Sequence, residues 1–355
     1  MAVDRSLKVM IGVLVALSSI AAASQASAVL APLTLALLII AVVWPVQSWL
    51  RSSLPLPPLV TLTLVICATA FFCFLFAALA AWAFTRVARA FVADQRYQTM
   101  YDALSTWLEG HDLTISGVWT EYFSAASLLS VVQRIAARLN TMMSLWVVAL
   151  VYVILGLLEV QDVKRRLLAL DNRELAETIR NSVAQTAAKL RRYAAVRTLM
   201  SIATGLAFGV VTSIAGLQHA VEWALIAFAL NYIPFIGPLI ATALPTVWAM
   251  THLDSWQAIL ALFIFLNIAQ FTIGSYLEPR VAGSALSISP FVVLFSVFFW
   301  AFLWGAFGAF IGVPITIAIV TFCEQHQSSR WVAQLLGGTV NPVKRQASLA
   351  NPGAS

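Results

Sequence analysis

The sequence contains few charged residues. Asp, Glu, Lys and Arg make up 10% of its 355 residues, against about 25% in a typical soluble domain. Because 61% of the residues are hydrophobic, the composition excludes a soluble globular protein and predicts one that crosses a membrane several times. The net charge of +6 does not indicate a nucleic-acid partner, since the basic residues lie in short segments beside apolar runs.

Residues with metal-binding or redox chemistry are also scarce. The three cysteines all lie in apolar runs, without the spacing of a disulfide framework or a metal site. The four histidines are far apart in the sequence, and no two of them form a ligand pair on one helix face. We therefore expect no metal and no cofactor.

Motifs of known catalytic sites are absent as well. The sequence has no His-Glu-x-x-His helix, no Gly-x-Ser-x-Gly elbow, no phosphate-binding Gly-x-x-x-x-Gly-Lys-Ser/Thr loop and no dinucleotide fingerprint. We therefore expect no catalytic residues and no enzyme activity. The missing phosphate-binding loop also argues against ATP-driven transport by this chain alone.

The sequence is rich in long apolar runs. Each is long enough, or nearly so, to cross a bilayer as a helix, and there are eight: 9–23, 28–50, 59–85, 142–159, 198–216, 220–250, 256–276 and 288–322. They predict an all-α polytopic integral membrane protein with about eight transmembrane helices. The first run follows Arg5 and Lys8 and resembles a cleavable signal peptide. We favour an uncleaved first helix, because the next apolar run begins at once at Val29.

Two polar intervals separate the apolar runs. Residues 86–141 carry equal numbers of acidic and basic residues, and their spacing predicts amphipathic helices packed on the membrane or on a neighbouring subunit. Residues 160–197 carry nine basic and four acidic residues, which predicts a basic amphipathic helix on the cytoplasmic membrane surface.

These intervals give a domain organisation and an orientation. By parity the 86–141 region is extracytoplasmic, whereas the N-terminus and the C-terminal tail are cytoplasmic. The expected parts are 1–85 (three transmembrane helices), 86–141, 142–159 (a fourth helix), 160–197, a C-terminal core over 198–325 and a partly disordered tail over 326–355.

The apolar run 220–250 is interrupted by Asn231-Tyr-Ile-Pro-Phe-Ile-Gly-Pro238. Pro234 and Pro238 each remove a backbone donor and clash with the preceding helical turn, and Gly237 adds flexibility. Backbone groups freed at membrane depth are tolerated only inside protein or beside a wet cavity. The break therefore indicates a transport path or a hinge; the alternative is a kinked helix that serves packing alone. Whether this run crosses the membrane or folds back is left open.

The run 256–276 carries polar residues within and just after it. Asn267 and Gln270 lie in apolar sequence, where amides usually hydrogen-bond a neighbouring helix. Glu278, Pro279 and Arg280 follow. Glu278 is either a gating or coupling carboxylate or one partner of an interfacial salt bridge with Arg280.

The last apolar run is too long for one straight crossing and contains helix-breaking residues. We expect a broken helix there, with Gly305, Gly308, Gly312 and Pro314 as the candidate break or hinge positions.

Taken in order, several of these motifs resemble the bacterial autoinducer-2 exporter family of permeases. They are Asn231 to Pro238, Glu278-Pro279-Arg280, Ser289-Pro290, and Phe299-Trp300 through Gly305 and Gly308 to Pro314, preceded by Arg197-Thr198 where the family often has Lys-Thr. The sequence departs from the family pattern at Leu286-Ser-Ile and at Ala301. The resemblance implies an ATP-independent permease of the bacterial inner membrane that forms homo-oligomers, with autoinducer-2 or sodium and protons as cargo.

Three functions remain open at this point. The first is a permease or exporter for a small polar solute, with the break at 231–238 and Glu278-Pro279-Arg280 lining its path beside Asn267 and Gln270. The second is a cation/proton antiporter in which Glu278 titrates. The third is a non-transporting oligomeric scaffold in the lipid bilayer.

Overall fold

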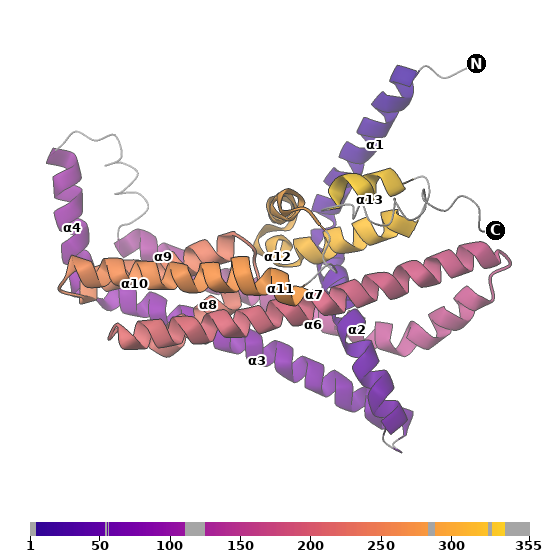
Figure 1. Cartoon of the computed structure of the whole chain (residues 1–355), viewed down its shortest axis with the longest axis horizontal. Coiled ribbons are helices and arrows are strands. Elements are labelled where there is room, and N and C mark those ends of the chain that lie inside the picture. Colours follow the sequence, from indigo (N-terminus) through magenta and orange to yellow (C-terminus); the bar gives the residue numbers. More distant parts are fainter. Residues whose placement is uncertain are drawn as a thin grey trace, which may run out of the picture. The chain divides into compact units, whose positions relative to one another are not determined.

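The computed structural model describes residues 5–53, 55, 57–110, 125–282, 288–325 and 329–337 (Figure 1). Within these residues the regular structure is helical, apart from one isolated bridge between Ile288 and Gly337. Six of the described helices are long and apolar enough to cross a membrane, which confirms an all-α polytopic membrane protein. The helices are α1 Arg5–Gln25, α2 Ser27–Ser53, α3 Pro58–Ala93, α4 Gln95–Gly110, α6 Ala125–Leu168, α7 Arg173–Ile214, α8 Ala220–Leu230, α9 Ile236–His252, α10 Trp256–Phe271, the π-helix η1 Thr272–Leu277, α11 Glu278–Ala282, α12 Pro290–Gln325 and α13 Arg330–Leu336.

Several helices run through the boundaries expected from composition. The expected boundary at residue 85 falls inside α3, and α6 joins the end of the 86–141 interval to the span that follows it. Part of that interval, residues 111–124, lies outside the described residues, as does most of the expected tail.

The basic segment 160–197 is not a separate surface helix. Its first part is the end of α6, and after a short turn α7 begins at Arg173 and runs unbroken through Arg197 to Ile214. The Asn172 side chain starts α7 by accepting a hydrogen bond from the Leu175 amide at 3.0 Å, as an N-cap does. The basic residues of this segment predicted a position at the membrane surface. The structure instead shows one continuous helix that contains both the basic segment and the apolar span after it.

The chain divides into two compact units. One comprises the described parts of Met1–Val42, Leu155–Tyr193 and Ala282–Ser355, and the other comprises those of Val43–Ile154 and Ala194–Val281. Each unit contains a helical hairpin with a sharply turned tip.

The unit of residues 43–154 and 194–281 contains hairpin 1, which consists of α8, the turn 231–235 and α9. The His219 ring, just before α8, lies 5.6 Å from the ring of Trp248, near the end of α9. Because these two residues lie about equally far from the turn, the two helices are antiparallel and the chain returns toward its starting side. At 1.5 Å per residue, α8 is about 16 Å long, roughly half the thickness of a bilayer core. The run 220–250 therefore folds back.

Hairpin 1 packs among α3, the C-terminal half of α7, and α10. Its buried contacts form one apolar core, made by Ala83, Val87, Phe208, Leu217, Trp223, Ile226, Ala227, Ala241, Trp248, Ala249, Leu262 and Leu266. Close approach of α7 to α8 depends on small residues, since a Cβ on Gly205 would lie 2.9 Å from the Ala224 carbonyl oxygen. The glycines of this face of α7, Gly205 and Gly209, thus let it pack on the hairpin.

The unit that includes residues 282–355 contains hairpin 2, formed by the two arms of α12. Trp304 and Gly305 leave helical geometry, and Gly305 has a φ of 64°. On either side of this break, Ser296 donates a hydrogen bond from its Oγ to the Gly312 carbonyl at 2.8 Å. The arms 290–303 and 306–325 are therefore antiparallel. Although α12 is long enough to span by length and composition, its first arm is only about 21 Å long.

Polar contacts within the same unit hold both ends of hairpin 2. At the tip, the Trp304 Nε1 donates to the Ala23 carbonyl at 3.0 Å. At the far end, Lys189 of α7 pairs with Glu324 at 2.6 Å. These two contacts pin the hairpin to α1 and to α7.

Candidate functional site

The turn at the tip of hairpin 1 is strained. The Ile236 amide donates to the Pro234 carbonyl at 2.7 Å, and Phe235 between them has a φ of 64° and a ψ of −54°. This is a γ-turn with positive φ, a rare conformation that costs a non-glycine residue about 1–3 kcal/mol. Strain of this kind persists only where neighbouring contacts hold it in place.

The glycine and second proline of the motif lie just after the turn, in the first turn of α9. A Cβ on Gly237 would overlap the Leu230 carbonyl, so only glycine permits the chain to double back this tightly. Pro238 occupies a position where a helix lacks an internal partner for the backbone amide. The break therefore lies at 231–235, slightly before the second proline.

The segment of α7 that faces the tip carries a buried polar stripe. Its polar residues lie on one helix face, interrupted there by Phe208, and all are at most 5% exposed: Arg197, Ser201, Thr204 and Thr212. A polar stripe inside an otherwise apolar span is costly in a bilayer unless it meets polar partners.

The tip supplies a polar partner to this stripe, at Ser201, and another to the neighbouring residue Thr198. The Tyr232 hydroxyl donates to the Thr198 Oγ1 at 2.9 Å, and the Asn231 amide donates to the Ser201 Oγ at 3.2 Å. Both contacts join the turn of hairpin 1 to α7.

A third polar contact joins α7 to the Glu-Pro-Arg corner. The Arg197 Nη1 lies 2.8 Å and 2.9 Å from the two carboxylate oxygens of Glu278. Of the two alternatives for Glu278, the salt bridge with Arg280 does not form among the described contacts: the Arg280 guanidinium lies over the Tyr276 ring, 3.9 Å from its centroid. Glu278 is thus paired with a buried cation 81 residues away in the sequence.

A π-helical segment positions Glu278. The run from Thr272 to Leu277 is π-helical and leads directly into α11 at Glu278, where Pro279 provides no backbone donor. The extra residue per turn rotates the residues that follow, and such segments are frequent at functional sites. Here it aims the carboxylate at α7.

We call the residues joined by these contacts the tip cluster: Arg197, Thr198, Ser201, Asn231, Tyr232 and Glu278. The position of this cluster along the membrane normal can be judged from α3, because Phe76, near the middle of α3, contacts the tip. The Phe76 ring lies 5.7 Å from Phe228 and 5.5 Å from Tyr232. The tip therefore ends level with the middle of a helix long enough to span the membrane.

The other predicted site residues lie outside this cluster. Asn267 is exposed on α10, and its side-chain amide donates to the Phe263 carbonyl one turn earlier at 2.8 Å. The Gln270 Nε2 is buried without a hydrogen-bond partner among the described residues. Neither makes a described side-chain hydrogen bond to the tip cluster.

Of the four positions expected to break the last run, only Gly305 lies at the break. Gly308 and Gly312 belong to the second arm, where each faces the backbone of the first arm. A Cβ on Gly308 would overlap the Trp300 carbonyl. Pro314 is also buried within this arm.

A family model described as "AI-2E family transporter" matches residues 9–327. The chain belongs to the AI-2E transporter family. Several of its described helices are apolar and of spanning length, so the chain is a multi-pass membrane protein of this family.

Relatives from bacteria carry transport names. The chain is similar to "AI-2 transport protein TqsA" of Escherichia coli K12, with 29% identity over 64% of this chain and 65% of TqsA. It is also similar to "Putative transport protein YhhT" of the same strain, with 34% identity over 41% of each chain. The chain thus aligns to less than two thirds of the length of either relative.

Four residues of the tip cluster in this AI-2E family member were not predicted as site residues. Thr198, Ser201 and Tyr232 are ordinary residues of an apolar span, and Arg197 was counted with the basic segment. The available signal was the spacing of Arg197, Ser201 and Thr204, which places polar groups on one face of a helix. The partners of that face could not be read from the sequence.

Proposed function

We propose that this permease moves a small polar solute, without ATP, past the tip of hairpin 1. The proposal depends chiefly on one observation, the polar contacts of Asn231 and Tyr232 with α7 at the level of the middle of α3. Autoinducer-2 is the first candidate solute, because the relative TqsA is named for its transport. The proposed direction is export.

The strengths of the contacts assign them different roles. Hydrogen bonds between neutral side chains of membrane helices contribute about 0.6 kcal/mol on average and at most about 1.7 kcal/mol. Removing one partner of a buried ion pair costs about 3–5 kcal/mol. We infer that the Arg197–Glu278 pair keeps α7 and α11 together during transport. The weaker hydrogen bonds of Tyr232 and Asn231 break, and the solute takes their place as hydrogen-bond partner.

The charges favour a polar solute over a metal cation. Glu278 is neutralised by Arg197, and the nearby Arg280 adds a further positive charge. A sodium ion would have to displace a guanidinium that contacts both carboxylate oxygens. These charges thus argue against cation/proton exchange at Glu278. The experiment below would detect such exchange if it occurred.

Solute flux in proteoliposomes tests the proposal. Tyr232→Phe combined with Thr198→Val removes one exchangeable contact, and we expect it to lower autoinducer-2 flux at least severalfold while the protein stays folded. The matched control is Tyr276→Phe, which removes an exposed phenol and keeps the ring under Arg280. Equal flux in both variants would contradict the proposed path. Proton movement driven by added sodium would favour the antiporter, and no flux of any solute or ion would favour the scaffold.

We further propose a bacterial inner-membrane location with a cytoplasmic N-terminus. The basic residues of 160–197 support a cytoplasmic position for that segment by the positive-inside rule. The N-terminus lies on the same side if the three intervening transmembrane helices and α6 each cross once.

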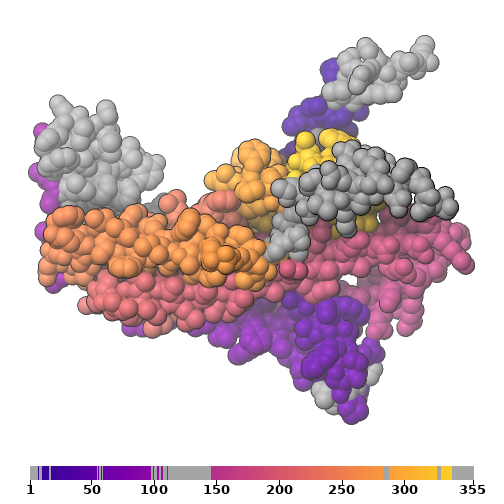
Figure 2. Space-filling model, viewed as in Figure 1, coloured from indigo at the N-terminus to yellow at the C-terminus, as the bar shows by residue number. Residues whose placement is uncertain are grey.

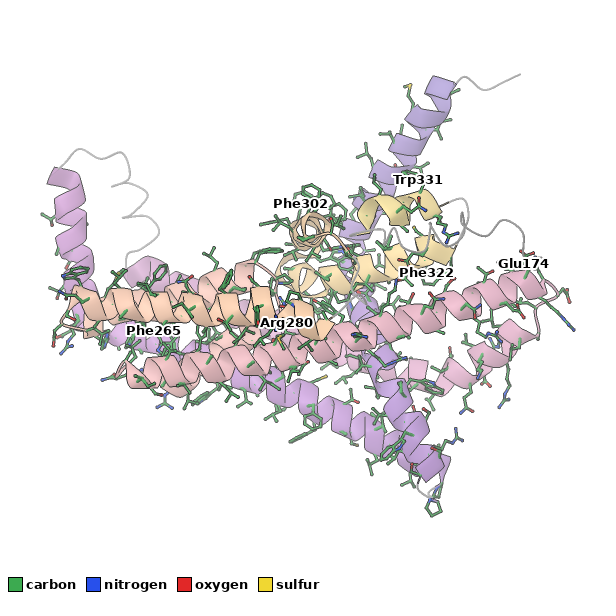
Figure 3. The ribbon with its side chains drawn as sticks, in the orientation of Figure 1. Glu174, Phe265, Arg280, Phe302, Phe322 and Trp331 are labelled. Carbon is green, nitrogen blue, oxygen red and sulfur yellow. The ribbon has the colours of Figure 1, made fainter. Side chains whose placement is uncertain are left out.

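We also propose that the permease forms homo-oligomers through α10. Figure 2 shows the surface of α10 (orange) open along its length, and Phe265 marks it in Figure 3. Asn267 is exposed there among exposed apolar side chains, which are Phe263, Ile264, Phe265, Ile268 and Phe271. Lipid offers this amide no partner, whereas the same amide of a second copy can both donate and accept.

Oligomer mass in detergent tests this interface. We expect Asn267→Leu to shift the mass measured by light scattering toward the monomer, and Gln257→Leu at the exposed start of α10 to leave it unchanged. An unaltered mass for Asn267→Leu would contradict an interface at this residue.

A further inference from the structure

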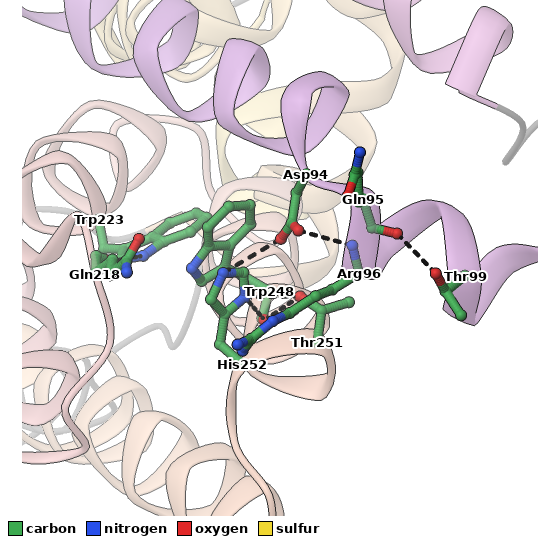
Figure 4. A network of polar contacts seen from close by, with 9 residues as sticks. All are labelled: Asp94, Gln95, Arg96, Thr99, Gln218, Trp223, Trp248, Thr251 and His252. Carbon is green, nitrogen blue, oxygen red and sulfur yellow. Dashed lines mark hydrogen bonds and ion pairs between the residues drawn. The ribbon is translucent and has the colours of Figure 1, made fainter.

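Asp94 and His252 join the open end of hairpin 1 to the end of α3. Asp94 lies in the break between α3 and α4, and His252 is the last residue of α9. The Asp94 Oδ2 lies 3.2 Å from the His252 Nε2, and the side chains are 14% and 15% exposed. Figure 4 shows the two side chains pointing toward one another beside Trp248. The carboxylate is oriented by its Oδ1, which accepts from the Arg96 amide at 2.9 Å.

Both ring nitrogens of His252 face acceptors. Nε2 faces the carboxylate, and Nδ1 lies 3.1 Å from the Trp248 carbonyl. The Thr251 hydroxyl lies 2.7 Å from Nδ1 and 2.9 Å from the same carbonyl, so its one proton can go to either acceptor. Only the imidazolium carries the positive charge that makes an ion pair with the Asp94 carboxylate.

An aromatic face and a helix end also lie beside His252. The ring stacks on Trp248 at 4.1 Å with an angle of 19° between the planes, a geometry that attracts a cation. His252 lies at the C-terminus of α9, where the helix carbonyls favour a cation. His219, on the other side of Trp248, lies at the N-terminus of α8, and its Nδ1 is buried without a hydrogen-bond partner. The two histidines are thus not equivalent.

The remaining charged groups around this contact are exposed or already paired. Arg96 and Asp254 are exposed, so water screens their charges. Glu222 of α8 is already paired with Arg86 of α3 at 3.0 Å. Asp94 is therefore the one largely buried carboxylate at His252 among the described residues.

We propose that Asp94 and His252 form a proton-binding latch on the base of hairpin 1. When His252 is protonated the latch closes and ties α9 to the end of α3. When it loses its proton the tie weakens and the hairpin moves more freely. Histidine is the side chain that changes charge between about pH 5 and 8, so acidification closes the latch. The effect on flux rests on the proposed function, whereas the latch itself does not.

A double-mutant cycle in thermal stability tests the latch without any transport measurement. The full chain, Asp94→Asn, His252→Gln and the double variant are melted in detergent at pH 5.5 and pH 8. We expect a coupling of about 2–4 °C in Tm at pH 5.5 and close to none at pH 8. Asp254→Asn, which removes an exposed carboxylate two residues from His252, is the matched control and should show no coupling at either pH.

A coupling that is absent, or equal at the two pH values, overturns the latch. If His252→Gln does not fold, Asp94→Asn alone tests the latch. The latch predicts that this variant loses more Tm, relative to the parent, at pH 5.5 than at pH 8.

Flux at equal pH on both sides of the vesicle tests the consequence for transport. We expect parent flux to fall severalfold from pH 8 to pH 5.5, and His252→Gln to abolish that fall. An equal fall in both proteins would overturn control by the latch and leave the proposed function standing. Absence of flux in every protein at both pH values would overturn the proposed function, while the melting experiment would still decide the latch.

Discussion

At the scale of single residues, a buried cation organises the candidate site. Arg197 is 5% exposed and contacts both carboxylate oxygens of Glu278. Its Nε has no hydrogen-bond partner among the described residues. A buried charge left without its counter-ion costs far more than a lost neutral hydrogen bond. The stability of the site should therefore depend on this pair more than on the hydroxyl contacts.

Substitution of either partner should reveal this dependence. We expect Arg197→Gln and Glu278→Gln each to lower the free energy of unfolding by about 3 kcal/mol, because each leaves the other charge unpaired. The double variant should lose less than the sum of the two. Denaturation in mixed detergent micelles measures the loss.

Arg280→Gln is the control, since its guanidinium is exposed and stacks on Tyr276. We expect this substitution to cost less than about 1 kcal/mol. Strictly additive losses for Arg197 and Glu278 would contradict a direct pair.

At the scale of elements, the two hairpins share one construction. Each tip has a residue with a φ of 64°, Phe235 in hairpin 1 and Gly305 in hairpin 2. In each, a glycine shortly after the tip faces a carbonyl of the first arm, Leu230 for Gly237 and Trp300 for Gly308. Both hairpins thus need a glycine at the point where the arms come closest.

Alanine substitutions of glycines should show whether these glycines are needed for close packing of the arms or only affect the stability of the helix that contains them. We expect Gly237→Ala and Gly308→Ala each to destabilise the protein by about 3 kcal/mol, because the added Cβ overlaps backbone that cannot move aside cheaply. Gly274→Ala is the control, since nothing lies within 4 Å of its Cβ position. Melting temperatures measured by size-exclusion chromatography after heating test the difference, and an equally stable Gly308→Ala would contradict the close approach.

Much of the element structure could be predicted from the sequence. The lengths of the apolar runs predicted the helices of spanning length. Pro234 and Gly237 predicted the break in run 220–250. The folding back could not be read from that run, because two short antiparallel helices and one kinked span have the same composition. The course of α7 was missed because the charge of Arg197 was read as interfacial. The partner of Glu278 was missed because a neighbouring arginine at 280 offered a simpler pair.

At the scale of the whole molecule, the hairpins bear on the topology, which was left open for run 220–250. One hairpin inverts every later segment relative to a chain of single crossings, and a second restores the original orientation. We expect Glu174 and Arg330 on the cytoplasmic side and Asp254 on the outside. Single cysteines at these three exposed positions, in a chain with its own cysteines replaced, can be labelled with an impermeant thiol reagent in intact cells. Labelling at Asp254 alone fits two hairpins, whereas a protected Asp254 would contradict a hairpin at 220–252.

The claim that transport passes the tip of hairpin 1 is tested most directly by fastening that tip to α7. Asn231→Cys and Ser201→Cys, at positions joined by a 3.2 Å hydrogen bond, can be linked by a short bifunctional methanethiosulfonate that a reducing agent removes. Solute flux in proteoliposomes is then measured before linking, after linking and after reduction. We expect flux to stop on linking and to return on reduction, and full flux through the linked protein would contradict the account.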